Sequence, residues 1–221
     1  MVSSIAGGGV TSGELNMVST SFGFEEKVES GDIDVVTNWS ETTGGTASRT
    51  ISNGKITFIT GVNLGSESRI DLNRPLNVDL DNLGGASSPY SKFVLEFVMA
   101  IDTIINVDEG IFFIGLGATT GATRVSDYAT GLILDGGDLK ILHDTAGSET
   151  LATAITGYTG TSKLIRLEYS QDALSVYVDG AYISSVTPPA SGQTEVLNIV
   201  LQNGNAADTR LYLYFLRGWF E

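Results

Sequence analysis

The chain has 221 residues and a mass of 23.3 kDa; 42% of the residues are hydrophobic and 17% are charged. This composition supports a buried core and excludes intrinsic disorder, and the length fits one large β domain. Twelve Lys and Arg against 26 Asp and Glu give a net charge of −14, which disfavours nucleic acid and anionic membrane surfaces as partners. The absence of cysteine excludes disulfides, thiolate catalysis and sulfur-ligated zinc.

Residues 1–21 are rich in Gly, Ser and Thr, with scattered apolar side chains. We expect them to form an N-terminal arm that anchors the chain in an assembly through Ile5, Val10, Leu15 and Val18. The start lacks the basic residues and the apolar run of about 7–15 residues that mark a secretory signal peptide. The longest apolar stretch, residues 110–118, is far shorter than the roughly 20 residues that cross a bilayer, so no membrane partner is expected.

From Phe22 onward, period-2 segments are separated by turn residues roughly every eight to twelve positions, which predicts an all-β sandwich. Asn53-Gly54 stands between two such segments and accepts the positive φ angles of a type I′ turn, so it predicts a β-hairpin. Two more hairpins are predicted at Gly136-Gly137 and at Asp179-Gly180. Antiparallel pairing should therefore dominate.

The last segment, residues 210–220, is apolar on both faces, which places it inside the fold or under a partner. Strict alternation predicts one face with Leu211, Leu213, Phe215 and Trp219, and an opposite face with Tyr212, Tyr214 and Phe220.

An ordered series of motifs resembles the concanavalin A-like lectin and glucanase superfamily, particularly its laminin G-like jelly rolls. The motifs are Trp39 with residues 44–47 and 52–57, then 93–100 with 110–117, then the hairpin 163–169 with 174–180, and the closing segment 211–220. The resemblance covers residues 22–221. It implies an all-β, concanavalin A-like jelly-roll sandwich of two antiparallel sheets, and the extended N-terminal arm of residues 1–21 is an addition to the family pattern. Because this scaffold carries lectins, glycosidases, lyases and structural modules, it does not specify a function.

No catalytic constellation stands out in the sequence. Glycosidases use two carboxylates about 5–10 Å apart, and the Glu-x-Asp-x-Glu strand of related glucanases is absent. There is no Gly-x-Ser-x-Gly elbow, and the Gln-x-His element of the superfamily's lyases is missing. The single histidine, His143, is interpreted as a residue that flanks a turn. We therefore expect no enzymatic activity.

Calcium is a candidate cofactor, because hard cations take clustered carboxylate and amide oxygens. Asp79, Asp81 and Asn82 supply such a cluster, although Leu83 breaks the EF-hand pattern. The alternative is a solvated acidic turn.

Glycan binding would use aromatic rings that stack on sugar faces, together with polar side chains that fix the hydroxyls. Three tyrosines in predicted loops have Ser, Thr or Asp nearby and are candidate glycan contacts: Tyr90, Tyr128 and Tyr158. The alternative for each is that it covers an edge of the core.

These observations together favour a non-enzymatic structural protein, a homo-oligomeric capsid-decoration or head-fibre subunit of a virion, assembled in the host cytoplasm without a signal peptide. The arm would contact capsid or other virion proteins, and the jelly roll would add weak adhesion to host-surface glycans. The alternative is a lectin-like carbohydrate-binding module, with calcium holding a loop.

Overall fold

A computed structural model of the chain describes residues 23–27, 39–52, 54–72, 83–84, 90–102, 111–118, 129–145, 148–187, 196–204 and 208–221. These residues form fifteen strands in two antiparallel sheets. In the part of the chain described, no helix has the length and apolar character needed to span a bilayer. The predicted all-β sandwich is confirmed.

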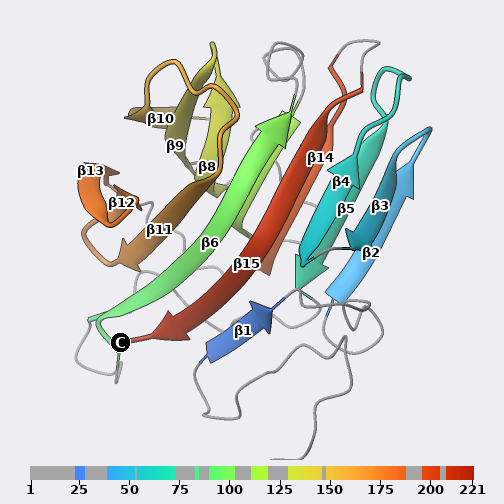
Figure 1. The fold of residues 1–221 in the computed structure, drawn as a ribbon. Coiled ribbons are helices and arrows are strands. Elements are labelled where there is room, and N and C mark those ends of the chain that lie inside the picture. Colours follow the sequence, from blue (N-terminus) through green and yellow to red (C-terminus); the bar gives the residue numbers. More distant parts are fainter. Residues whose placement is uncertain are drawn as a thin grey trace, which may run out of the picture.

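The first sheet has eight strands in the order β13-β12-β11-β6-β15-β4-β3, and β1 pairs with β15 off this path (Figure 1). Their bounds are β1 Gly23–Lys27, β3 Ser48–Ser52, β4 Lys55–Ile59, β6 Lys92–Asp102, β11 Lys163–Ser170, β12 Leu174–Val178, β13 Ala181–Val186 and β15 Arg210–Phe220.

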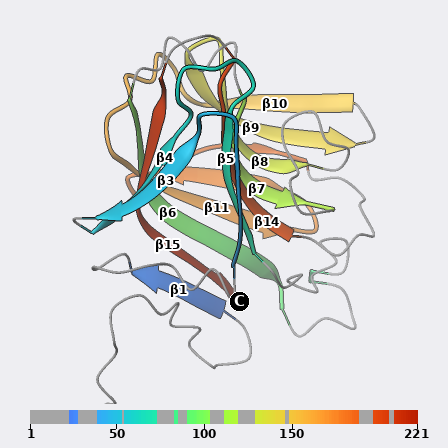
Figure 2. The ribbon, with the colours of Figure 1, turned by 90° about the vertical axis from the view of Figure 1, so that its right-hand side faces the viewer.

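The second sheet has seven strands in the order β10-β9-β8-β7-β14-β5-β2, and it forms a second layer behind the first (Figure 2). Their bounds are β2 Trp39–Gly44, β5 Glu67–Leu72, β7 Ile111–Gly117, β8 Thr130–Asp135, β9 Asp138–Thr145, β10 Ser148–Ile155 and β14 Val196–Gln202.

The three predicted hairpins are confirmed as β3–β4, β8–β9 and β12–β13. Their turns adopt positive φ angles: 70° at Gly54, 61° and 77° at Gly136 and Gly137, and 51° and 84° at Asp179 and Gly180. Asp179 is the only non-glycine residue with positive φ in the described part of the chain, which its short polar side chain tolerates. Each turn therefore joins its two strands with the twist that antiparallel pairing needs.

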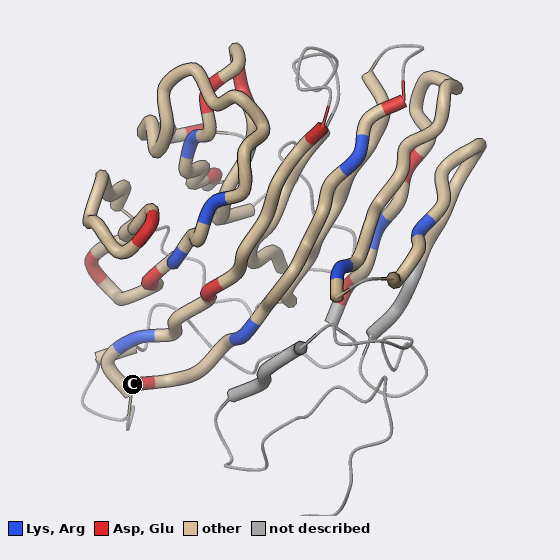
Figure 3. The backbone as a smooth tube through the Cα atoms, viewed as in Figure 1, with Lys and Arg blue, Asp and Glu red and all other residues tan. Residues whose placement is uncertain are grey.

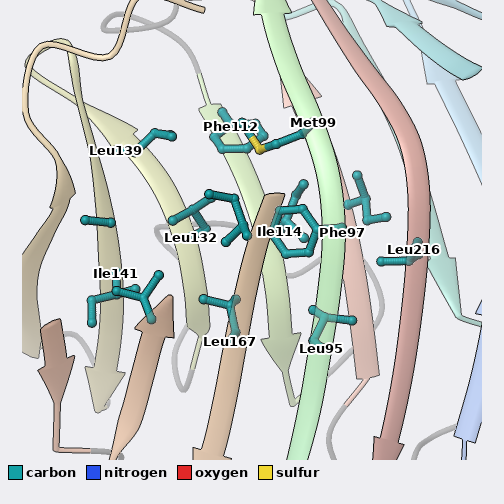
Figure 4. Packing of buried hydrophobic residues seen from close by; sticks show 14 of the residues in the cluster. Leu95, Phe97, Met99, Phe112, Ile114, Leu132, Leu139, Ile141, Leu167 and Leu216 are labelled. Carbon is teal, nitrogen blue, oxygen red and sulfur yellow. The ribbon is translucent and has the colours of Figure 1, made fainter. Parts of the chain in front are cut away.

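The core lies between the two sheets and is built from alternate residues of each strand (Figure 4). Phe97 and Met99 of β6 meet Phe112 and Ile114 of β7, and all four are fully or almost fully buried. Burial of each such side chain contributes about 1.5–3 kcal/mol. Residues between them in sequence point to the outer faces of the sheets, so the core pattern also fixes which side chains lie on each outer face.

A β-bulge changes the orientation of the closing strand β15. Its register with β6 shifts at Tyr214, which is the extra residue of the bulge. After the bulge, Phe220 faces the core and contacts the buried Phe93, whereas Phe215 and Trp219 lie on the outer face. The prediction of strict alternation is wrong for these residues, because one extra residue exchanges the faces of all that follow.

Two glycines lie opposite each other where β7 and β8 approach closely. Gly115 pairs with Gly131. A Cβ atom on Gly115 would lie 2.3 Å from the carbonyl oxygen of Thr130, and one on Gly131 would lie 2.4 Å from the carbonyl oxygen of Ile114. Because the obstructing atoms belong to the backbone, any side chain here must push the two strands apart.

We predict that Gly115→Ala lowers the free energy of unfolding by about 2–3 kcal/mol, through this backbone clash. Urea denaturation of both forms measures the difference. Gly44→Ala is the matched control, because no atom lies within 4 Å of its added methyl group, and it should change stability by less than about 0.5 kcal/mol. Equal urea midpoints for the two variants would show that the close approach is not required.

Candidate functional site

The outer face of the seven-stranded sheet carries a buried apolar cluster. Its members are fully buried side chains from β7, β8, β9 and β14 and the residue preceding β8: Phe113, Ala129, Ile133, Leu142 and Val200. Because none of these side chains reaches solvent, this part of the sheet offers no accessible surface for a ligand. The outer face of the eight-stranded sheet, in contrast, carries partly exposed polar and aromatic side chains.

On that face, five residues of five neighbouring strands stand in one register: Tyr182 on β13, Tyr177 on β12, Arg166 on β11, Glu96 on β6 and Arg217 on β15. We call these residues the cross-strand row. They point outward because the residues on either side of them in β6, β11 and β12 belong to the core. The row therefore brings together side chains from positions 96 to 217 of the chain.

Arginine and aromatic side chains stack along this face. The guanidinium carbon of Arg166 lies 5.9 Å from the ring centre of Tyr177 and 5.4 Å from that of Trp219. The guanidinium of Arg217 lies 4.8 Å from Trp219 and 5.3 Å from Phe215. Exposed cation–π contacts are worth about 0.5–1 kcal/mol each, and together they hold these planar groups in fixed orientations.

Carboxylates pair with both arginines. Arg217 Nη2 donates a short hydrogen bond to Glu96 Oε1, and Arg166 Nη2 lies 2.7 Å from Glu168 Oε1. Figure 3 marks charged residues of both signs on β6 and β11 and basic residues on β15. Partly exposed ion pairs of this kind contribute little to stability, but they restrict the rotation of the guanidinium groups.

Trp219 is oriented by a hydrogen bond. Its Nε1 donates to Glu221 Oε1 over 2.8 Å, and Lys92 Nζ lies 2.9 Å from the other oxygen of the same carboxylate. The hydrogen bond from Lys92, and then that from Trp219, lower the pKa of Glu221, while Glu221 raises the pKa of Lys92. The indole is therefore held between a fixed carboxylate and two guanidinium groups.

A cavity of about 180 Å³ opens beside the centre of the row, lined by Glu96, Leu164, Arg166, Tyr177 and Gly180. Its walls combine a carboxylate acceptor, a guanidinium donor, an aromatic ring and an aliphatic side chain. The hydrogen bond from Arg217 engages one oxygen of Glu96, a residue that also lines the cavity. This arrangement can hold a small polar molecule that has one apolar face.

The predicted glycan contacts lie elsewhere in the fold. Tyr158 is only 4% exposed; it packs in the core, and its hydroxyl donates to the carbonyl of Thr161 over 2.9 Å. Burial raises its pKa to about 12. The expectation that Tyr158 offers its ring to a sugar is corrected, because its ring is enclosed by the core.

Tyr90 is half-buried, and its ring centre lies 5.2 Å from that of Phe220 at the edge of the core. A glycan contact through Tyr90 stays a prediction. Other predicted site residues lie outside the described residues: Tyr128, Asp79, Asp81, Asn82, Ile5, Val10, Leu15 and Val18. The calcium site and the anchoring arm therefore also stay predictions. In the described ranges, no group of three or more His, Asp and Glu side chains is placed to hold a metal ion.

His143 lies within β9, not beside a turn as expected from the sequence. It is 5% exposed and pairs in register with Thr130 of β8. Burial lowers the pKa of His143, and the charge of Asp144 partly opposes this effect. The imidazole is therefore a neutral part of the folded interior and stands in the sheet opposite to the cross-strand row.

We predict that His143 makes the protein less stable as the pH falls. Its lowered pKa means that the unfolded chain binds a proton below pH 6.5 while the folded chain does not, so stability is full above pH 6.5 and is lost below it until the folded-state pKa is reached. His143→Gln should remove this part of the pH dependence. Urea denaturation between about pH 5 and pH 8 measures it, and parallel profiles for both proteins would contradict the assignment.

The sequence did not reveal the cross-strand row. Arg166 and Tyr177 could have been found, because alternation in the hairpin places both outside the core. Glu96 and Arg217 lie on different strands and are 121 residues apart in sequence. The bulge at Tyr214 also places Arg217 on the face opposite to the one that strict alternation predicts. Only the register between those strands brings the four residues together.

No protein-family model matches the chain, and no curated protein matches it. Solved structures do. The carbohydrate recognition domain of Emp47p is 15% identical with a TM-score of 0.59, and the match covers 91% of this chain and 96% of that domain. The binding domain of botulinum neurotoxin serotype D/C is 10% identical with a TM-score of 0.56 over 84% of this chain, which spans 45% of that domain.

Alginate lyase AlyC3, solved in complex with dimannuronate, is 8% identical with a TM-score of 0.55, and the match covers 76% of this chain and 75% of that one. Identities this low show the fold alone. The fold is a concanavalin A-like jelly-roll sandwich of two antiparallel sheets, as the motifs of the sequence predicted.

Proposed function

We propose that this chain is a non-catalytic binding module that recognises a carbohydrate on the outer face of its eight-stranded sheet. The observation that carries the proposal is the cavity beside the cross-strand row. A sugar ring presents hydroxyl groups at its edge and C–H groups on its faces. In the cavity, Glu96 accepts from a hydroxyl, Arg166 donates to one, and Tyr177 packs against the C–H face.

Two features support binding without turnover. Glu96 is the only carboxylate among the described residues that line the cavity, whereas glycosidases place two carboxylates across the scissile bond. Glu96 also accepts a hydrogen bond from Arg217 Nη2, which holds the carboxylate in one orientation on this face. The structural similarity to a carbohydrate recognition domain and to a toxin binding domain supports the same proposal.

We predict that Tyr177→Ala weakens saccharide binding about tenfold, because loss of a stacking ring costs about 1–1.5 kcal/mol. A glycan array identifies the ligand, and calorimetry measures the affinity. Leu64→Ser is the control, because Leu64 is 72% exposed in the β4–β5 turn and does not line the cavity. If the unmodified protein binds no glycan, the function is wrong; if Tyr177→Ala binds as tightly as the unmodified protein, the site is wrong.

A second proposal concerns residues 1–21. We propose that this arm attaches the module to a larger assembly, namely a homo-oligomer on the surface of a virion, where glycan binding would serve adhesion to a host. The supporting observation is that the arm leads into β1, which pairs with residues 215–219 of β15 beside Arg217. Attachment and ligand binding would then lie close together on one sheet.

Deletion of residues 1–21 tests this attachment and leaves β1 intact, since β1 begins at Gly23. We expect light scattering to give a defined oligomer for the full chain and a monomer below 23.3 kDa for the shortened one. A monomer in both cases, or the same oligomer in both, would contradict assembly through the arm.

A further inference from the structure

The cross-strand row runs across the strands, and this direction sets a repeat distance. Neighbouring strands lie about 4.7–4.9 Å apart, so the five strands of the row span about 19 Å. A pyranose unit in an extended sugar chain advances by a length comparable to this strand spacing. A chain that lies along the row therefore meets each strand with about one sugar unit.

We propose that the ligand is a linear, neutral, extended polysaccharide that lies along the cross-strand row from β13 to β15 with about one sugar unit per strand. This inference rests on the proposed function and adds the class of carbohydrate, its direction on the sheet and the number of sugar units in contact. The central unit occupies the cavity beside Glu96 and Arg166.

The two ends of the row are aromatic, which gives the outer units surfaces to stack on. At one end Tyr182 is 56% exposed on the edge strand β13, and its ring lies edge-on to that of Tyr177 with centres 5.6 Å apart. At the other end Trp219 and Phe215 flank Arg217 on β15. Because β13 is the edge of its sheet, a long chain can continue past Tyr182.

The charges of the face favour a neutral chain over an acidic one. Three cations near the row whose side chains the structure describes already pair with carboxylates: Arg166 with Glu168, Arg217 with Glu96, and Lys163 with Asp179 at 2.7 Å. An acidic polysaccharide would have to displace these partners and approach a protein with a net charge of −14. Hydroxyl groups can share the same donors and acceptors without displacing them.

The test measures affinity as a function of chain length. Calorimetry is run with β-1,4-linked oligosaccharides of glucose, mannose and xylose from one to six units, and with oligomannuronate as the acidic probe. We expect the affinity for one neutral series to rise about tenfold or more from two to five units and then to level off. The binding should change less than about twofold between 50 mM and 500 mM salt, because no net charge is exchanged.

Variants locate the chain on the sheet. Tyr182→Ala should weaken binding of the five-unit chain by a larger factor than binding of the two-unit chain, because only the five-unit chain must extend to β13. Arg166→Lys keeps the charge but removes the planar group between Tyr177 and Trp219, and it should weaken binding of every length. Leu64→Ser is again the control, and urea midpoints confirm that each variant is folded.

The outcomes separate the inference from the proposed function. A single sugar that binds as tightly as six units would overturn the extended ligand and leave a glycan-binding site. Tight binding of oligomannuronate with steep salt dependence, or equal losses at both lengths for Tyr182→Ala, would overturn the neutral chain or its direction. If no probe binds and the glycan array is also blank, the row serves only to stiffen the sheet, and both proposals fail.

Discussion

The pairing of β15 with β6 is the constraint on which the site depends. Ten residue pairs join these two strands at the centre of the eight-stranded sheet, interrupted by one bulge at Tyr214. Without the bulge, Arg217 and Trp219 would point into an apolar interior, where an unpaired guanidinium is strongly unfavourable. With the bulge, Phe220 packs against the core, and Arg217 and Trp219 lie on the outer face. One extra residue therefore determines both which side chain completes the core and which side chains lie on the outer face.

The two faces of this sheet differ in what they contribute. The inner face supplies buried Phe, Leu, Ile and Met side chains, whose transfer from water dominates stability. The outer face is held by ion pairs and cation–π contacts that are partly exposed and individually weak. Because the fold does not depend on these outer contacts, the cross-strand row could diverge without loss of the sandwich. This independence is consistent with a scaffold that carries many functions.

The hairpins were predictable because each depends on a short local sequence. The turn residues at Gly54, at Gly136-Gly137 and at Asp179-Gly180 adopt the positive φ angles that a tight hairpin turn requires. The site was not predictable in the same way. Glu96 meets Arg166 and Arg217 through pairings between distant segments, and no local pattern encodes that register. The prediction that Tyr158 contacts a glycan failed for a related reason. Tyr158 lies in a connection between strands, but its side chain packs in the core.

The distribution of charge narrows the kinds of partner that the face can accept. The chain is strongly acidic overall, but on the outer face of the eight-stranded sheet the arginines are matched by neighbouring carboxylates. A charged partner would gain attraction to one set of groups and suffer repulsion from the other, and it would also have to separate pairs that already orient each other. A partner with hydroxyl groups exchanges hydrogen bonds with water for hydrogen bonds with groups whose positions are fixed in advance, so little ordering is required when it binds. The balance of charge, as much as the aromatic rings, therefore makes a neutral polyhydroxylated chain the best match for this surface.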